Sequence, residues 1–97
     1  MFRVVAHAKS KPGEADALRA ILSKLVRHSR AEEGVVRYDV FESVERRGEF
    51  TFFEEYGDEA AFEAHKASRH VVVASARAAS LLEDELVIDV VQPIACE

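Results

Sequence analysis

Hydrophobic and polar positions follow two different periods along the chain, and the change between them divides the sequence into elements. Four short segments alternate with a period of about two and are rich in β-branched and aromatic residues, a pattern that predicts strands. They cover residues 2–9, 35–44, 50–56 and 86–91. The polar stretch ERRGE, which contains Gly48, separates the second segment from the third and indicates a short hairpin loop.

A long stretch with helical spacing of its apolar residues lies between the first two predicted strands. It runs from Glu14 to about Glu32, with acidic residues in its first turn and basic residues near its last, as the helix dipole prefers. Gly34 is suited to the C-terminal end of such a helix. The pattern therefore predicts a helix that packs one apolar face on the sheet.

Two further helices are predicted before the last strand. Asp58 is a suitable N-cap for a helix over residues 59–67, and Ser68 can cap another over residues 69–82. The second of these contains three consecutive valines, which resist helix, but its Ala-rich remainder favours it. Helix is therefore the prediction for both segments.

The order of predicted elements is β-α-β-β-α-α-β. Two right-handed crossovers of the βαβ type place the helices on one face of a four-stranded antiparallel sheet. This is the ferredoxin-like α+β arrangement, and 97 residues suit a single domain over residues 1–97.

Both faces of the predicted sheet have apolar side chains. The last strand places Leu86, Ile88 and Val90 on one face, and Val87 and Val91 on the other. The second strand divides in the same way, with Val36, Tyr38, Val40 and Val44 opposite Val35 and Phe41. Because the face without helices would otherwise meet water, we expect an identical sheet to cover it in a homodimer.

Two titratable residues are predicted to meet between the sheet and the helices. Alternation puts Glu54 on the same strand face as Phe50, Phe52 and Tyr56, and helical spacing turns His65 toward the sheet beside Phe62. A carboxylate that fixes the tautomer of an imidazole is suited to proton transfer. The same pair is equally suited to a structural hydrogen bond that ties a helix to the sheet.

The sequence favours no metal centre and no bound cofactor. His70 follows the break at Ser68, and a five-residue step within one continuous helix would turn it about 140° from His65, which excludes a simple two-histidine zinc face. The four glycines are well separated, so no phosphate-binding loop is present. We therefore expect no metal, flavin, nicotinamide or haem.

Charge and cysteine content narrow the class of protein. A net charge of −5 without a basic patch argues against nucleic-acid binding. Cys96 is the only cysteine, so no internal disulfide can form, and no apolar run approaches the ~20 residues of a membrane span. We expect a cytoplasmic protein that binds no nucleic acid and no membrane.

The segments EEGVVRYDVFES and FTFFEEYGDEAAFEAHKASRH resemble the antibiotic biosynthesis monooxygenase (ABM) family, and the resemblance runs over nearly the whole chain. It implies a ferredoxin-like subunit paired into a dimeric α+β barrel, with a pocket between sheet and helices. Some members of the family oxidise polycyclic phenols or hydroquinones with O₂, without a metal or flavin. Tyr56 stands where the family usually has Trp, and Ser75 stands near the position of the haem-ligating His of the haem-degrading branch.

The resemblance implies a cofactor-independent monooxygenase acting on a small phenolic, quinol or polycyclic aromatic substrate. The proposed catalytic residues are His65 as base and Glu54 as its partner. The residues expected to bind substrate are Phe50, Phe52, Phe62, Tyr38, Tyr56 and His70. Two alternatives stay open, an isomerase or tautomerase of a small carbonyl metabolite, and a non-catalytic small-molecule-binding dimer.

Overall fold

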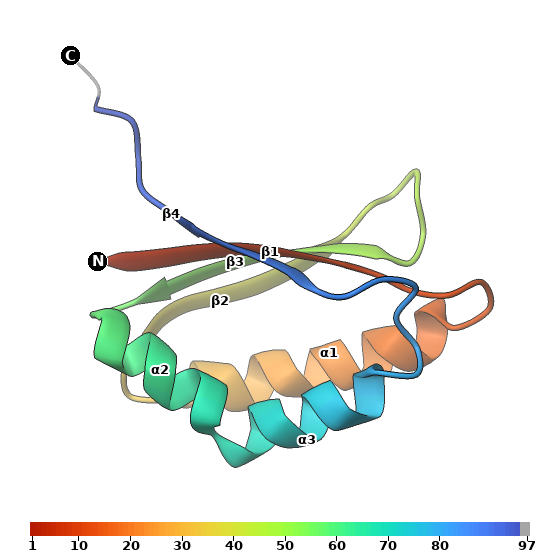
Figure 1. Ribbon diagram of the computed structural model, residues 1–97, viewed down its shortest axis with the longest axis horizontal. Helices are drawn as coiled ribbons and strands as arrows, with labels where there is room; N and C mark the ends of the chain where they lie inside the picture. The colour runs from red at the N-terminus through yellow and green to blue at the C-terminus, as the bar shows by residue number, and fades with distance from the viewer. Residues whose placement is uncertain (96–97) are drawn as a thin grey trace.

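A computed structural model describes residues 1–95 and shows two layers, a sheet and a set of helices beneath it (Figure 1). Cys96, the residue from which the sequence excludes a disulfide, lies outside the described range. The elements are β1 (Phe2–Lys9), α1 (Ala15–Arg30), β2 (Val35–Glu42), β3 (Glu49–Tyr56), α2 (Glu59–Ala67), α3 (Arg69–Ala78) and β4 (Val87–Val91). The predicted α+β ferredoxin-like fold, with four antiparallel strands and three helices, is confirmed.

The sheet has the strand order β2-β3-β1-β4, and every neighbouring pair is antiparallel. Figure 1 shows all three helices on one face of this sheet. In the register, Val4 of β1 lies opposite Glu54 of β3, and Glu54 lies opposite Tyr38 of β2. Three chemically different side chains therefore stand in one row across the sheet, on the face that the helices cover.

The core lies between the two layers and follows the predicted alternation. Phe50, Phe52, Glu54 and Tyr56 are all buried, whereas Phe53 is 40% exposed on the opposite face. Helix α1 contributes its buried leucines to this core, as its apolar spacing predicts. A buried carboxyl group within an aromatic strand face is therefore a real feature of the fold.

A β-bulge corrects the predicted faces at the start of β2. The alternation places Val36 with Tyr38 and puts Val35 on the other face, but the register shifts between Val35 and Arg37. An extra residue at a bulge reverses the alternation beyond it. Val35 consequently packs against the core, and Val36 is 57% exposed.

The structure confirms the predicted N-cap at Asp58 and differs from the predicted cap at Ser68. The Asp58 side chain accepts a hydrogen bond from the backbone N–H of Ala61, at 2.8 Å, which confirms the predicted N-cap. Ser68 occupies the N-cap position of α3, but its hydroxyl donates to the carbonyl oxygen of His65, at 2.6 Å. Helix α3 ends at Ala78 rather than Leu82, because Leu82 forms a bridge with Ser10 beside β1.

Gly34 allows α2 to approach the start of β2. A Cβ atom at this position would lie 2.6 Å from the Cβ of Ala61 on α2, a distance that real side chains do not reach. Helix α1 already ends at Arg30, so Gly34 does not terminate it as the sequence suggested. The glycine instead brings the segment after α1 close to α2 and to the histidine that α2 carries.

The face of the sheet without helices has exposed aromatic residues. Phe41 is 52% exposed and Phe53 40%, and their rings pack edge to face with centroids 5.8 Å apart. All five residues of β4 are exposed, although the sequence VIDVV has the composition of a buried strand. None of the helices within residues 1–95 has the length and apolar character needed to cross a membrane.

Candidate functional site

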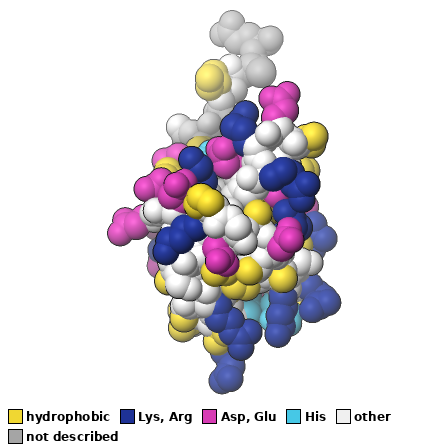
Figure 2. Space-filling view, turned by 90° about the vertical axis from the view of Figure 1, so that its right-hand side faces the viewer, with side chains coloured by type: hydrophobic (Ala, Val, Ile, Leu, Met, Phe, Trp, Pro, Cys, Tyr) yellow, Lys and Arg dark blue, Asp and Glu magenta, His cyan; other side chains and the backbone are white. Residues whose placement is uncertain are grey.

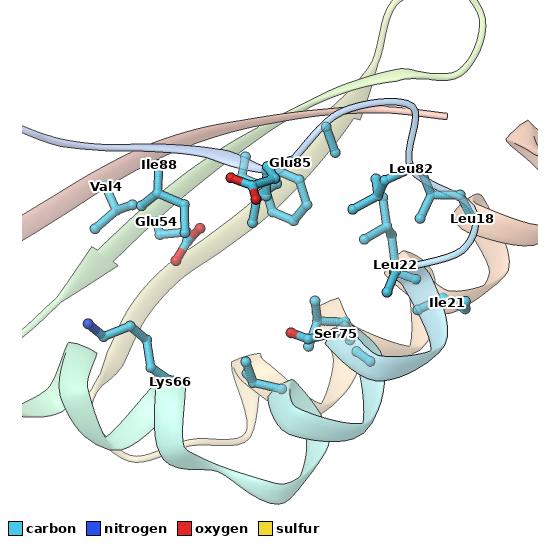
Figure 3. A pocket seen from close by; sticks show the side chains of 18 of the residues that line it. Val4, Leu18, Ile21, Leu22, Glu54, Lys66, Ser75, Leu82, Glu85 and Ile88 are labelled. Atoms are coloured by element: carbon cyan, nitrogen blue, oxygen red, sulfur yellow. The ribbon is translucent and has the colours of Figure 1, made fainter. Parts of the chain in front are cut away.

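A cavity of about 660 Å³ separates the sheet from the helices (Figure 3). The residues predicted to form the site and found in its wall are Tyr38, Phe52, Glu54, Phe62 and His65. Figure 3 shows the Glu54 carboxyl group pointing into this space from the sheet, opposite Lys66 of α2. The cavity therefore reaches both residues proposed as catalytic, and hydrocarbon side chains form most of the remaining wall.

Three of the residues expected to bind substrate lie outside this cavity. Tyr56 is fully buried behind it, against Phe62, with ring centroids 5.2 Å apart. Phe50 lines a different cavity, between α1 and β2, because it stands four residues from Glu54 along β3. His70 lines a third cavity, between α1 and α3.

The cavity that His70 lines is strongly basic. Its other charged side chains are Lys24 of α1, and Arg69 and Arg77 of α3. Figure 2 shows Lys and Arg side chains gathered with histidine at the bottom of the molecule, where Figure 1 places the helices. The sequence shows no such group, because α1 and α3 are far apart in the chain and only their packing joins these residues.

The carboxylate that orients His65 is Glu32, not Glu54. His65 Nδ1 lies 2.7 Å from Glu32 Oε2, and the His65 side chain is only 5% exposed. The predicted hydrogen bond between Glu54 and His65 is therefore wrong, although the two side chains line the same cavity. Sequence periodicity missed Glu32 because α1 ends at Arg30 and leaves this residue in a connecting segment.

The same oxygen of Glu32 also meets His70. Glu32 Oε2 lies 2.7 Å from His70 Nε2, and Ser68 Oγ lies 3.2 Å from the same nitrogen. Because a carboxylate can only accept, His70 Nε2 carries a proton that it donates to Glu32, and the longer contact with Ser68 Oγ is the weaker branch of the same donor. The Glu32 carboxylate thus accepts from both histidines.

This network assigns the tautomer of His65. A carboxylate at Nδ1 places the ring proton on that nitrogen and leaves Nε2 of the neutral ring with a free lone pair. No residue of the described chain forms a hydrogen bond with Nε2, and His65 lines the large cavity. His65 therefore has the arrangement of a base whose proton-accepting nitrogen is open to a bound molecule.

Glu54 has a different environment from Glu32. Burial raises the pKa of Glu54, and the hydrogen bond that Tyr56 donates to its Oε1 opposes this rise only in part. Burial likewise raises the pKa of Tyr56, which stays a neutral donor. Tyr56 therefore acts on the cavity indirectly, because its hydroxyl fixes the Glu54 carboxyl group.

Glu32, His65 and His70 are also the residues that could hold a metal ion. Their ligand atoms lie within 4.8 Å of one another, and two imidazoles with one carboxylate are donors that Zn²⁺ accepts. The helical-spacing argument does not apply to this pair, because the extended backbone of Ser68 interrupts the helix between them. The 2.7 Å separations are nevertheless those of hydrogen bonds, which explain the cluster without an ion.

The comparison with known protein families agrees with this architecture. The family model of the antibiotic biosynthesis monooxygenases (ABM) matches residues 1–77. The chain belongs to this family. Membership supports a monooxygenase-like role and leaves the substrate open, and it confirms the resemblance seen in the sequence.

Two bacterial proteins are similar to this ABM-family chain in sequence. "Putative monooxygenase YcnE" of Bacillus subtilis is 39% identical over 70 residues, which are 72% of this chain and 74% of that protein. "Putative monooxygenase Rv0793" of Mycobacterium tuberculosis is 33% identical over 91 residues, 94% of this chain and 89% of that protein.

Solved structures share the fold over nearly the full length. The structure of Rv0793 from Mycobacterium tuberculosis superposes with a TM-score of 0.89 at 32% identity, covering 97% of this chain and 95% of that one. The crystal structure of PA3566 from Pseudomonas aeruginosa gives 0.90 at 32% identity, covering 97% and 94%. A crystal structure described as an antibiotic biosynthesis monooxygenase gives 0.92 at 25% identity, covering 98% and 100%.

Proposed function

We propose that this protein is a cofactor-independent monooxygenase that acts on a phenolic or quinol-like aromatic molecule with O₂. The observation that carries the proposal is a buried histidine that lines a large apolar cavity, with its Nδ1 held by Glu32 and no hydrogen bond of the described chain to its Nε2. A phenolic hydroxyl has a weakly acidic proton and an electron-rich ring. A positioned base and an apolar wall are what such a substrate requires.

His65 starts the reaction by removing the proton of the substrate hydroxyl at Nε2. The imidazolium that forms is stabilised by the Glu32 carboxylate at Nδ1, as in other histidine–carboxylate pairs. Glu54 lies across the cavity wall in the row of Val4 and Tyr38, where its carboxyl group, fixed by Tyr56, can hydrogen-bond a second oxygen of the substrate.

In an anthrone-type substrate, the phenolate then transfers electrons to O₂, and oxygen bonds to the activated CH₂ carbon of the ring system. The O–O bond of this hydroperoxide breaks, the second C–H proton is lost, and water leaves. The CH₂ group and O₂ thus become a carbonyl group and H₂O, and the proton held on His65 returns to the leaving oxygen. Phe52 and Phe62 line the cavity and exclude water around the anion.

Incubation of the purified protein under O₂ with an anthrone tests this function, as does incubation with menadiol, which has no ring CH₂ group and is oxidised to its quinone while O₂ is reduced to H₂O₂. We expect oxygen consumption and a carbonyl product, and replacement His65→Gln lowers kcat by roughly 10²- to 10⁴-fold because the base is lost. His7→Gln serves as the matched control, since His7 is exposed on the sheet face away from the cavity. Turnover that is unaffected by His65→Gln would remove the proposed base.

The same experiment separates the alternative enzyme. An isomerase would use His65 to exchange a carbon-bound proton of a small carbonyl compound without consuming oxygen. If deuterium from the solvent enters such a compound while the oxygen concentration stays unchanged, the protein is an isomerase rather than a monooxygenase.

The proposed functional unit contains a second copy of the chain. The exposed pair Phe41 and Phe53, and a β4 strand exposed on both faces, form an apolar surface that a second sheet of the same sequence would cover. Leu86 and Ile88 line the cavity and are 39% and 50% exposed, so the cavity is open on the side of β4. A second subunit that also packed along the edge of β4 would close the site.

A further inference from the structure

The cavity beneath the sheet has two chemically different ends. At one end Val4 lies opposite Glu54 in the strand register, and His65 lies on the helix below. At the other end Ala8 lies opposite Phe50, four residues further along β1, which corresponds to about 13 Å at 3.3 Å per residue. Figure 3 shows this direction, with Glu54 and Lys66 at one side and the leucines at the other.

The far end is lined by hydrocarbon. Its walls are formed by Leu18, Ile21 and Leu22 of α1, by Leu82 after α3, and by alanines of α3. A single phenolic ring bound at His65 would leave this end empty. An aliphatic chain that extended from the ring would cover it and remove apolar surface from water.

The charges around the cavity are mainly negative. The exposed carboxyl groups of Glu83, Asp84 and Glu85 line it together with the buried one of Glu54 and the ammonium group of Lys66, and the Glu83 carboxylate pairs with Lys9 at 3.1 Å. The Lys66 ammonium group is already engaged, 3.0 Å from Glu63 and 4.6 Å from the centre of the Phe62 ring. Since Glu83 bonds through its backbone N–H to Lys9 at the end of β1, the acidic segment borders the leucine end.

We propose that the cavity binds a phenol or quinol with an uncharged aliphatic tail, its hydroxyl at His65 and its tail along the leucine end. The inference deepens the proposed function and rests on it for the identity of the polar head. The apolar end specifies the tail, and the acidic segment excludes a tail that ends in a carboxylate.

Binding without turnover tests the tail. Calorimetric titration under nitrogen compares phenol with para-butylphenol, para-hexylphenol and para-octylphenol. We expect the Kd to fall by about fourfold per methylene, the equivalent of about 0.8 kcal/mol, until the cavity is filled. Equal affinity for all four compounds would overturn the proposal.

A bulky side chain introduced at the leucine end tests where the aliphatic tail binds. Ala79 lines the cavity at the end of α3 and is exposed, so Ala79→Phe fills space without displacing a buried side chain. This variant should lose at least tenfold in affinity for para-octylphenol and little for phenol. Ala76→Phe, on the same helix but exposed and away from the cavity, should behave like the natural chain. Equal losses in both variants would contradict the location.

A phenol whose octyl tail ends in a carboxylate tests the charge. We expect at least tenfold weaker binding than for para-octylphenol, and recovery of the binding of this carboxylate in the double variant Asp84→Asn/Glu85→Gln. Tight binding of the carboxylate to the natural chain would overturn the charge argument. Because these measurements need no O₂, a protein that binds the series but does not oxidise menadiol would refute the proposed reaction alone.

Discussion

At the scale of single residues, the two carboxyl groups of the site have separate roles because their surroundings differ. Glu32 accepts from two imidazoles through one oxygen. Glu54 is buried against hydrocarbon, and its hydrogen bond comes from a neutral phenol, that of Tyr56. A difference in burial and in hydrogen-bond donors is how a protein assigns different tasks to the same side chain.

Replacement of Glu32 should impair turnover of menadiol or an anthrone without removing the base itself. In Glu32→Gln the amide no longer fixes the proton on Nδ1 of His65, so a fraction of the protein has its proton on Nε2, where it cannot act. We expect kcat to fall by at least about tenfold, less than the roughly 10²- to 10⁴-fold that removal of a base costs, with KM nearly constant.

The neighbouring residue provides the matched control for this variant. Glu33→Gln removes the same charge from an exposed position one residue away, and should leave kcat unchanged. Nitrogen NMR of the His65 ring gives an independent readout, because its tautomer should change in Glu32→Gln and not in Glu33→Gln. An unchanged tautomer with a lowered kcat would show that Glu32 acts in another way.

Glu54 should make stability depend on pH in a direction set by its raised pKa. The folded state binds the Glu54 proton more tightly than the unfolded state, so this group lowers the free energy of unfolding as pH rises from the ordinary value of 4.5 through the raised pKa. Glu54→Gln removes the charge and keeps an acceptor for Tyr56. Urea unfolding should show Glu54→Gln to be more stable than the natural chain at about pH 8, and the difference should vanish below about pH 4. If Glu54→Gln is less stable than the natural chain at both pH values, then ionisation of Glu54 does not destabilise the folded state.

Alternation and helical spacing predicted that Glu54 and His65 face the same interior, and both do line the cavity. They could not predict the partner of His65. Periodicity orders residues within an element, whereas Glu32 lies after the end of α1 and reaches His65 only because the connection passes under α2.

At the scale of elements, the order and type of all seven agreed with the sequence, and the differences lie where tertiary contacts decide. Helix α3 stops at Ala78 because Leu82 pairs beside β1, and the bulge at Val35 turns that side chain toward the core. Neither contact has a local signal in a single sequence. Both follow from the packing of segments that are distant in the chain.

The approach of α2 to β2 can be tested at Gly34. In Gly34→Ala the new methyl group would lie 2.6 Å from Ala61, so α2 must shift, at a cost of about 1–3 kcal/mol. The double variant Gly34→Ala/Ala61→Gly should recover part of this loss, so that its destabilisation is smaller than the sum of the two single changes. Thermal unfolding gives the measurement, and Gly57→Ala, where a Cβ meets nothing within 4 Å, is the control. If the destabilisation of the double variant equals the sum of the two single destabilisations, the side chains at positions 34 and 61 do not clash.

At the scale of the whole molecule, the uncovered sheet face and the open cavity have the same cause. The strand β4 lies at the edge of the sheet, where its residues are exposed, and its Ile88 is at once a wall of the cavity and a half-exposed side chain. The sequence predicted apolar residues on both faces of this strand, but not that β4 would border the site. That relation depends on the strand order, which places β4 next to β1.

Phe53 provides the test of the proposed dimer. Phe53→Glu places a carboxylate in the centre of the apolar face, beside Phe41, and burying an unpaired charge against a second copy is strongly unfavourable. We expect sedimentation velocity at micromolar concentration to give a dimer for the natural chain and a monomer for this variant. Val72→Glu, an equally drastic change at a 56% exposed position on α3, should remain dimeric. If the second copy also closes the cavity, Phe53→Glu should weaken the binding of para-octylphenol while Val72→Glu does not. If the natural chain sediments as a monomer, the proposed dimer is wrong, and the exposed face binds a different partner.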